Sequence, residues 1–311
     1  MRHEAPLVAE PWADLTEAVE GARIVAIGVA RNGKVYAAAG FTNEAPFAER
    51  HGCRFARSRF DVPATYHLIA WDGGEVRRVI VRDELVVSYV QPTRQGVLLV
   101  GARCVLGRSG PERNAVEYDH TGTVVRRFTL GDGIEDVRTG SDGSVWVSYF
   151  DEGVFGNRGW GEGTEPIGAD GCVRFDVDGA RTWSFSPTEA GTEMIVDCYA
   201  MNVASNDEAW LCFYTGFPIV RVARRGCAVW EPGVRGVQAL AIDHDRALLV
   251  GDYERPDVTR VVHLGDRGRA KVEAPRPLVT PDGAPLIGRP VGIAGTLYVV
   301  RGTEVFCVMN W

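Results

Sequence analysis

Acidic residues open two of the apolar, strand-like segments of this 311-residue sequence, and they are the first candidates for chemistry. Glu135 and Asp136 lie in the segment GIEDVRTG, and Asp197 opens DCYAMN further along the chain. Carboxylates that meet at a partly desolvated site repel one another, and a bound cation, a cationic substrate or a raised pKa relieves that repulsion. We therefore expect Glu135 or Asp136 to act as a general base, Asp197 to orient the substrate, and Arg289 to bind a substrate anion.

A structural role is the alternative for the acidic pair. Either carboxylate could cap backbone amides, or it could form an ion pair with Arg23, Arg138 or Arg289. Removal of the charge separates the two cases, because an ion-paired carboxylate contributes to stability and a ligand-binding one need not.

Aromatic and acidic residues near the ends of other strand-like segments are expected to line a binding site for a small polar molecule. When the strand-like segments are aligned by the short turns that join them, these residues fall at or near equivalent positions. The predicted substrate-binding residues are Tyr89, Asp151, Trp160, Tyr199, Tyr214 and Asp252. Together with the carboxylates, they favour a hydrolysis or isomerisation reaction.

Composition excludes several other classes of function. The formal net charge is −7 and no basic stripe is visible, so we expect no nucleic-acid partner. No apolar run reaches membrane-spanning length and the first residues resemble no signal peptide, so we expect no membrane partner and a cytoplasmic location. The seven cysteines form no CxxC pair and most lie in apolar runs, which predicts free, buried thiols.

The elements that must position these residues are strands in a repeated unit. In residues 133–150 an apolar segment enters a Ser-Asp-Gly turn and leaves as a Val/Trp/Tyr/Phe-rich strand, and residues 172–185 add two strands joined by Asp-Gly. This four-stranded antiparallel unit occurs six times, the last time with one strand missing. The pattern predicts an all-β chain in which residues 1–311 form a single six-bladed β-propeller, and residues 6–10 complete the last blade.

The repeat resembles the broad class of six-bladed propellers that includes gluconolactonase-type, NHL-type and strictosidine-synthase-like proteins. In gluconolactonase-like propellers the channel binds a divalent metal through Glu, Asn and Asp of the inner strands. By that resemblance, a calcium or magnesium ion would be held by Glu135, Asp136, Asp197 and Asn202. The family's Glu-x-Pro-like opening of the first inner strand is absent, since Glu10-Pro11 precedes that strand.

The connections between strands differ sharply in length. Every turn between strands one and two, and between strands three and four, is short, whereas long insertions follow the second strand at residues 41–65, 104–114 and 151–170. Long loops in a compact domain are commonly functional, so one face is expected to carry the site. A closed pocket beneath the first insertion would favour a small-molecule ligand, whereas exposed phenylalanines on it would favour a protein or peptide partner.

Overall fold

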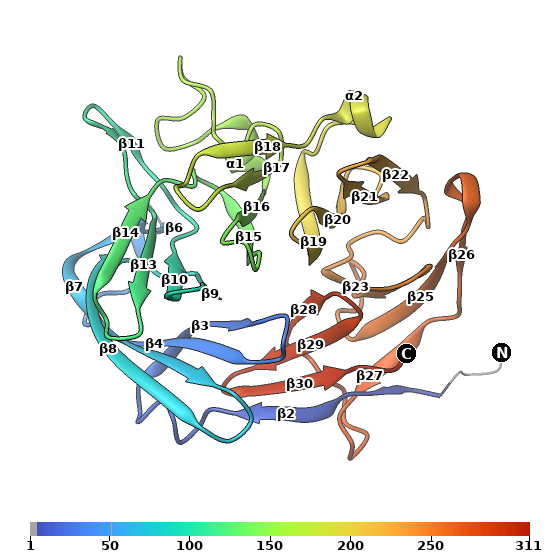
Figure 1. The fold of residues 1–311 in the computed structure, drawn as a ribbon, viewed down its shortest axis with the longest axis horizontal. Helices are drawn as coiled ribbons and strands as arrows, with labels where there is room; N and C mark the ends of the chain where they lie inside the picture. The colour runs from blue at the N-terminus through green and yellow to red at the C-terminus, as the bar shows by residue number, and fades with distance from the viewer. Residues whose placement is uncertain (1–4, 51) are drawn as a thin grey trace. The chain divides into compact units, whose positions relative to one another are not determined.

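The computed structural model describes residues 5–50 and 52–311, and it is built almost entirely of β-strands. Six sheets follow one another along the chain, five of them four-stranded and antiparallel and the fifth blade extended to six strands, which confirms the predicted all-β, six-bladed β-propeller (Figure 1). The described residues divide into two compact units with three blades each. We call residues 16–184 the first unit, and residues 5–15 with 185–311 the second unit. No helix among the described residues is long and apolar enough to cross a membrane.

The first unit contains blades one to three. Blade one is formed by β3 (Arg23–Val29), β4 (Val35–Phe41), β7 (Arg59–Trp71) and β8 (Val76–Leu85). Blade two is formed by β9 (Tyr89–Pro92), β10 (Gly96–Val100), β13 (Ala115–Asp119) and β14 (Val124–Phe128). Blade three is formed by β15 (Ile134–Thr139), β16 (Val145–Tyr149), β17 (Cys172–Phe175) and β18 (Arg181–Ser184). The insertions add β5 (Phe47–Arg50), β6 (Cys53–Ala56), β11 (Leu106–Gly107), β12 (Gly110–Pro111) and α1 (Asp151–Phe155).

The second unit contains blades four to six. Blade four is formed by β19 (Asp197–Ser205), β20 (Glu208–Tyr214), β21 (Ile219–Ala223) and β22 (Gly226–Trp230). Blade five is formed by β23 (Ala239–Asp243), β24 (Arg246–Val250) and β25 (Val258–Leu264), with β26 (Ala270–Val272) and β27 (Arg276–Val279) both paired to β25. Blade six is formed by β28 (Arg289–Ile293), β29 (Thr296–Arg301) and β30 (Glu304–Val308), and β2 (Glu10–Asp14) completes it. The remaining elements are β1 (Leu7–Val8), α2 (Pro187–Ala190) and the short 3-10 helix η1 (Asp266–Gly268).

The local sequence explains the hairpins. In blade three, Gly143 and Gly179 adopt φ values of 88° and 81°, which favour glycine, at the Ser-Asp-Gly and Asp-Gly turns. The carboxylate of Asp142 accepts hydrogen bonds from the amide and hydroxyl of Ser144, and Asp176 accepts one from the amide of Ala180. Each aspartate therefore stabilises the turn that it begins.

Burial follows the position of a strand in its blade. The second strands β10 and β16 are buried at every residue, because neighbouring blades cover both faces of a sheet. The outer strand β14 begins with two exposed valines, whereas its arginines, which the sequence pattern RRF suggested to be solvated, are half-buried and pair with the buried carboxylates of Glu117 and Asp83. Paired tryptophans pack within blades, with ring centroids 5.3 Å apart for Trp146 and Trp183 and 5.6 Å apart for Trp210 and Trp230.

A buried polar cluster joins blades one and two. Asp83 of β8 accepts hydrogen bonds from Nη2 of Arg127 at 2.5 Å, from the Tyr118 hydroxyl, and from the amide of Leu85 at 2.9 Å. Burial alone would raise the pKa of Asp83, but the hydrogen bonds from Arg127 and Tyr118 outweigh it and the pKa lies below its usual value. The ionised carboxylate is therefore part of what holds these two blades together.

We expect this cluster to make the protein sensitive to acid. An unfolded aspartate has a pKa of about 3.9, so the stabilisation by ionised Asp83 is complete above that pH and is lost as pH falls through the lower folded-state pKa. Asp83→Asn should be less stable than the parent at neutral pH and should lose less further stability below about pH 4. Urea unfolding across pH measures both effects, with Glu75→Gln at an exposed turn of the same blade as the control. Parallel pH profiles for Asp83→Asn and the parent would contradict this role.

The closure of the last blade is shifted relative to the sequence prediction. The missing outer strand is supplied by residues 10–14, not by 6–10: β2 pairs with β30, with Glu10 opposite Cys307. The preceding residues Leu7 and Val8 instead form β1, which pairs parallel with β27 of blade five. The reason is apolar burial, because Leu7 is only 4% exposed and packs into the core of the second unit.

Two neighbouring residues of β1 give a matched test of this N-terminal segment. Leu7→Ala should lower the free energy of unfolding by about 2–5 kcal/mol, since it deletes a buried side chain. Val8 is 40% exposed, so Val8→Ala should change stability by no more than about 0.5 kcal/mol. Chemical denaturation of both variants measures the difference, and equal effects would show that β1 is not anchored.

Candidate functional site

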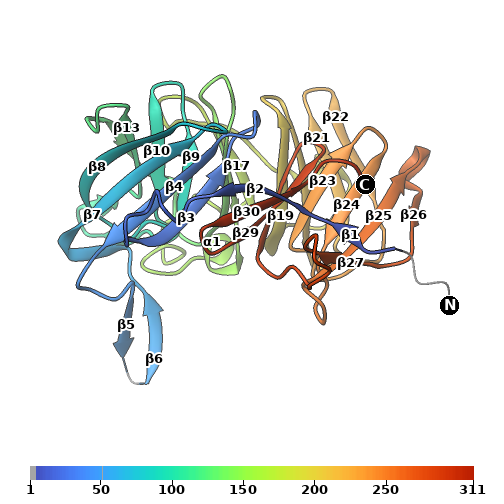
Figure 2. The ribbon, with the colours of Figure 1, turned by 90° about the horizontal axis from the view of Figure 1, so that it is seen from below.

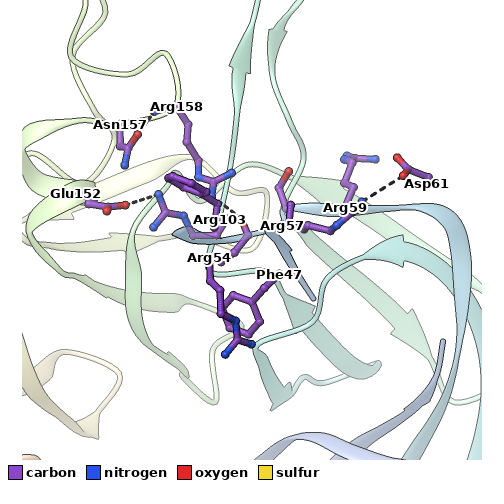
Figure 3. A pocket seen from close by; sticks show the side chains of 13 residues that line it. Phe47, Arg54, Arg57, Arg59, Asp61, Arg103, Glu152, Asn157 and Arg158 are labelled. Carbon is purple, nitrogen blue, oxygen red and sulfur yellow. Dashed lines mark hydrogen bonds and ion pairs between the residues drawn. The ribbon is translucent and has the colours of Figure 1, made fainter. Parts of the chain in front are cut away.

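The three long insertions of the first unit meet around one cavity of about 920 Å³ (Figure 3). Each insertion comes from a different blade, and each follows the second strand of that blade as the sequence predicted. The residues that line the cavity are Phe47, Ala48, Arg54, Phe55, Ala56, Arg57, Ser58, Arg59, Asp61, Arg103, Glu152, Asn157 and Arg158. Five of them are arginines, so positively charged side chains outnumber the two acidic ones in the lining.

The first insertion is a hairpin that pairs with no blade strand. Strands β5 and β6 form a separate two-stranded sheet that projects away from blade one (Figure 2). Its base is closed by Glu44, whose carboxylate accepts hydrogen bonds from the amides of Asp61 and Val62 at 3.1 and 2.8 Å and lies 3.3 Å from Arg57. On the hairpin itself, the guanidinium of Arg54 lies 4.5 Å from the ring centroid of Phe47.

A buried ion pair forms the side of the cavity that belongs to blades two and three. Nη2 of Arg103 lies 2.7 Å from Asp132 and 2.5 Å from Glu152, and Asp132 also accepts a 2.7 Å hydrogen bond from the amide of Cys104. Burial raises the pKa of Asp132 in spite of these donors. Burial would also raise the pKa of Glu152, but the hydrogen bond from Arg103 outweighs it and that pKa is lowered. Arg103 thus lies between two carboxylates, of which Asp132 has a raised pKa and Glu152 has a lowered pKa.

Arg158 is held by its backbone as much as by its side chain. Its φ is 52°, its amide donates a 2.7 Å hydrogen bond to Oδ1 of Asn157, and its carbonyl accepts one from the amide of Leu106. Its guanidinium donates to the carbonyl of Ala56 and thereby connects the third insertion to the hairpin. Burial and the charge of Arg103 lower the pKa of Arg158, so its surroundings favour additional negative charge.

The remaining arginines differ in how far their charges are compensated. Arg57 lies 3.2 Å from Asp61, and Arg59 pairs with Glu84. Among the described residues, Arg54 has no carboxylate within 4.0 Å, and Arg158 reaches one only at 4.0 Å. The cavity therefore offers guanidinium groups with unused hydrogen-bonding capacity, which suits a bound carboxylate or phosphate.

The sequence-predicted acidic pair lies elsewhere in the first unit, on β15. The hydroxyl of Tyr89 donates to the carbonyls of Ile134 and Glu135 at 2.8 Å each, so Tyr89 and the acidic pair do lie together. Asp136 lies 2.8 Å from Nη2 of Arg138, and both side chains are largely buried. This ion pair is the structural alternative that the sequence left open.

The other predicted catalytic residues belong to the second unit. Asp197 and Arg289 begin β19 and β28, as the aligned repeats predicted. Asn202 is fully buried, with Nδ2 donating to the carbonyls of Leu240 and Ala294, and Oδ1 accepting from the amide of Ala294. Its amide therefore connects blades four, five and six.

The proposed metal-ligand set does not fit these contacts. The side chain of Asn202 is used on backbone groups, and Asp136 is paired with Arg138. Within residues 5–50 and 52–311, no group of three His, Cys, Asp or Glu side chains is arranged to hold a metal ion. We therefore assign no step to a calcium or magnesium ion.

The predicted substrate-binding residues are dispersed. Trp160 is 6% exposed and donates from Nε1 to the carbonyl of Cys104, so it supports the second insertion and does not line the cavity. Asp151 begins α1 next to the lining residue Glu152. Asp252 forms a 2.8 Å ion pair with Arg260 and stabilises its own turn.

Two predicted residues do meet, in blade four. Tyr199 and Tyr214 both contact the ring of Phe217, at centroid distances of 4.9 and 6.1 Å, and Tyr253 joins the same cluster. Tyr214 and Tyr253 remain 42% and 60% exposed. They form an aromatic surface of the second unit.

Sequence reasoning identified the insertions but missed their arginines. The signal was present in the segment CRFARSRF, where Arg54, Arg57 and Arg59 are closely spaced within the longest insertion. Arg103 and Arg158 carried no such signal, because their neighbours in space are distant in the chain.

Fold and site together define a six-bladed propeller with an arginine-lined cavity. Among solved structures, the chain is similar to virginiamycin B lyase from Staphylococcus aureus, with 13% identity, 95% of this chain and 97% of that chain covered, and a TM-score of 0.45. It is also similar to a putative gluconolactonase, with 14% identity, coverage of 98% and 92%, and a TM-score of 0.44. A putative 6-phosphogluconolactonase from Bacteroides uniformis gives 13% identity, coverage of 88% and 77%, and a TM-score of 0.48. No protein-family model and no curated protein matches the chain.

The ion pair on β15 leads to a stability prediction. Asp136→Asn should lower the free energy of unfolding by about 3 kcal/mol, because Arg138 would keep a buried charge without its partner. Asp178→Asn, at an exposed turn of the same blade, is the control and should be nearly neutral. Denaturation that leaves Asp136→Asn as stable as the parent would restore Asp136 as a functional candidate.

Proposed function

We propose that this protein is an enzyme-like propeller that binds a small, negatively charged polar molecule in the arginine-lined cavity of its first unit. The observation that carries the proposal is the convergence of five arginines from three separate insertions on one cavity. Several guanidinium groups brought together from distant parts of a chain oppose one another unless an anion is bound.

The electrostatics of the cavity support an anionic ligand. Asp132, the buried carboxylate behind Arg103, does not belong to the cavity lining, whereas Asp61 and Glu152 do. The lining therefore holds five arginines and two carboxylates. The lowered pKa of Arg158, caused by burial and by Arg103, indicates that positive charge is not fully compensated there. An anion at this position would relieve the repulsion between Arg103 and Arg158.

The carboxylates around Arg103 support an enzymatic role of the hydrolysis or isomerisation type. Asp132 has a raised pKa because of burial, whereas Glu152 has a lowered pKa and lines the cavity. Only Glu152 of these two lines the cavity, so Glu152 is the carboxylate placed to act as a general base, and Asp132 holds Arg103 in position. Glu152 would be ionised at neutral pH and would face the bound molecule.

Binding of simple anions tests the proposal. Citrate and inorganic phosphate should raise the melting temperature of the parent protein, and a neutral polyol at the same concentration should not. Arg158→Met should weaken citrate binding about 10- to 100-fold, the value of one hydrogen bond to a charged group. The control is Arg77→Met, because the Arg77 side chain is 75% exposed on β8 and lies outside the cavity. The proposal fails if neither anion binds, or if Arg77→Met has the same effect.

A protein or peptide partner is the second candidate, supported by exposed apolar residues on the first insertion. Phe41, Phe47, Phe55 and Val62 are 45%, 41%, 49% and 63% exposed. A partner of this kind would carry acidic residues that complement the cavity. Binding of an acidic peptide that citrate does not displace would favour this candidate.

A further inference from the structure

We propose that the ligand of the arginine-lined cavity is an organic phosphate monoester whose phosphate is attached to a flat apolar group. This inference rests on the proposed function and specifies the class of molecule bound. The argument depends on the size of the cavity, on the two kinds of side chain that line it, and on the number of guanidinium groups.

The cavity is too large for a simple ion. Its volume of about 920 Å³ lies within the range of about 300–1,000 Å³ that is typical for sites of small organic molecules. A lone phosphate or sulfate would occupy a small part of it. The ligand therefore has an organic portion besides its charge.

The hairpin borders the cavity with apolar side chains from both of its faces, with Phe47 and Ala56 on one face and Ala48 and Phe55 on the other. Phe47, Ala48, Phe55 and Ala56 all line the cavity, and the two phenylalanines leave close to half of their side chains exposed, at 41% and 49%. Large exposed apolar side chains that border a cavity are typical of ligand or partner contacts. A flat apolar group is the kind of ligand that stacks against such rings.

The hairpin carries a guanidinium group and an aromatic ring side by side. Arg54 and Phe47 lie on the same face, because Phe47 is opposite Ala56, and Arg54 is opposite Glu49, in the β5–β6 register. The Arg54 guanidinium lies 4.5 Å from the Phe47 ring centroid. Figure 3 shows the two side chains next to one another. A ligand with an oxyanion next to a flat group can contact both side chains at once.

The number of guanidinium groups favours phosphate over carboxylate. Arg54 and Arg158 lack a close carboxylate, and Arg57 and Arg103 each have a buried Nε without a hydrogen-bond partner among the described residues. A phosphate monoester offers three terminal oxygens and up to two negative charges, whereas a carboxylate offers two oxygens and one charge. The planar guanidinium group of arginine can form paired hydrogen bonds with either a carboxylate or a phosphate. We therefore choose the phosphate monoester because it has more negative charge and more oxygen acceptors to offer the arginines.

Calorimetric titration with three probes tests the inference on the intact chain. Phenyl phosphate should bind at least tenfold more tightly than methyl phosphate, and benzoate should bind at least tenfold more weakly than phenyl phosphate. In Phe47→Ala/Phe55→Ala, phenyl phosphate should fall to within threefold of methyl phosphate, while the affinity for methyl phosphate stays unchanged. Phe155→Ala is the matched control, since Phe155 is 56% exposed on α1 and does not line the cavity.

The outcomes separate this inference from the proposed function. Equal binding of phenyl and methyl phosphate would overturn the apolar contact, and equal binding of benzoate and phenyl phosphate would overturn the phosphate class. If citrate raises the melting temperature but none of the three probes binds, the phosphate ester is wrong while anion binding stands. If no anion binds at all, the proposed function itself fails. Should the double variant have a lower melting temperature than the parent, the single variants Phe47→Ala and Phe55→Ala replace it.

Discussion

The candidate site depends on the ion pair between the buried carboxylate of Asp132 and the side chain of Arg103. Asp132 lies in the connection between β14 and β15, and it binds the side chain of Arg103 and the amide of Cys104 at 2.7 Å each. Its desolvation is unfavourable, as the raised pKa shows, and a buried carboxylate of this kind is tolerated only with strong partners. Removal of one member of such a pair typically costs about 3–5 kcal/mol. The position of Arg103 is consequently determined by the interior of the protein, while its side chain also lines the cavity.

The same principle governs the other polar residues inside the blades. Asn202 joins three blades through hydrogen bonds to backbone groups, and Asp83 joins two through Arg127 and Tyr118. Polar groups that lose water on burial must find partners, and between blades the available partners are the neighbouring strands. A polar residue on an inner strand can therefore serve to link neighbouring blades just as well as to bind a ligand. The resemblance to gluconolactonase-like propellers implied a metal-ligand role for Asn202, whereas in the structure its side chain bonds to the backbone of neighbouring blades.

The blades could be predicted because their determinants are local. Short polar turns and predominantly apolar second strands lie within each repeat and recur at a regular spacing. The arginine site could not be predicted, because its contacts join residues far apart in sequence. Arg103 meets Asp132 across 29 positions, and Arg158 meets Ala56 across 102. The N-terminal strand falls between these cases: its presence followed from the missing strand of blade six, but its register depended on the burial of Leu7 against blade five.

The isolation of the β5–β6 hairpin has an evolutionary consequence. Among the described residues no blade strand pairs with it, and Glu44 closes its base by accepting hydrogen bonds from the amides of Asp61 and Val62 at the start of β7. Residues 47–56 can therefore diverge in length and composition while the hydrogen-bonded ladders of blade one remain intact. A scaffold of this kind can acquire new ligands by exchanging one loop, so selection for specificity and selection for folding act on separate stretches of the same gene.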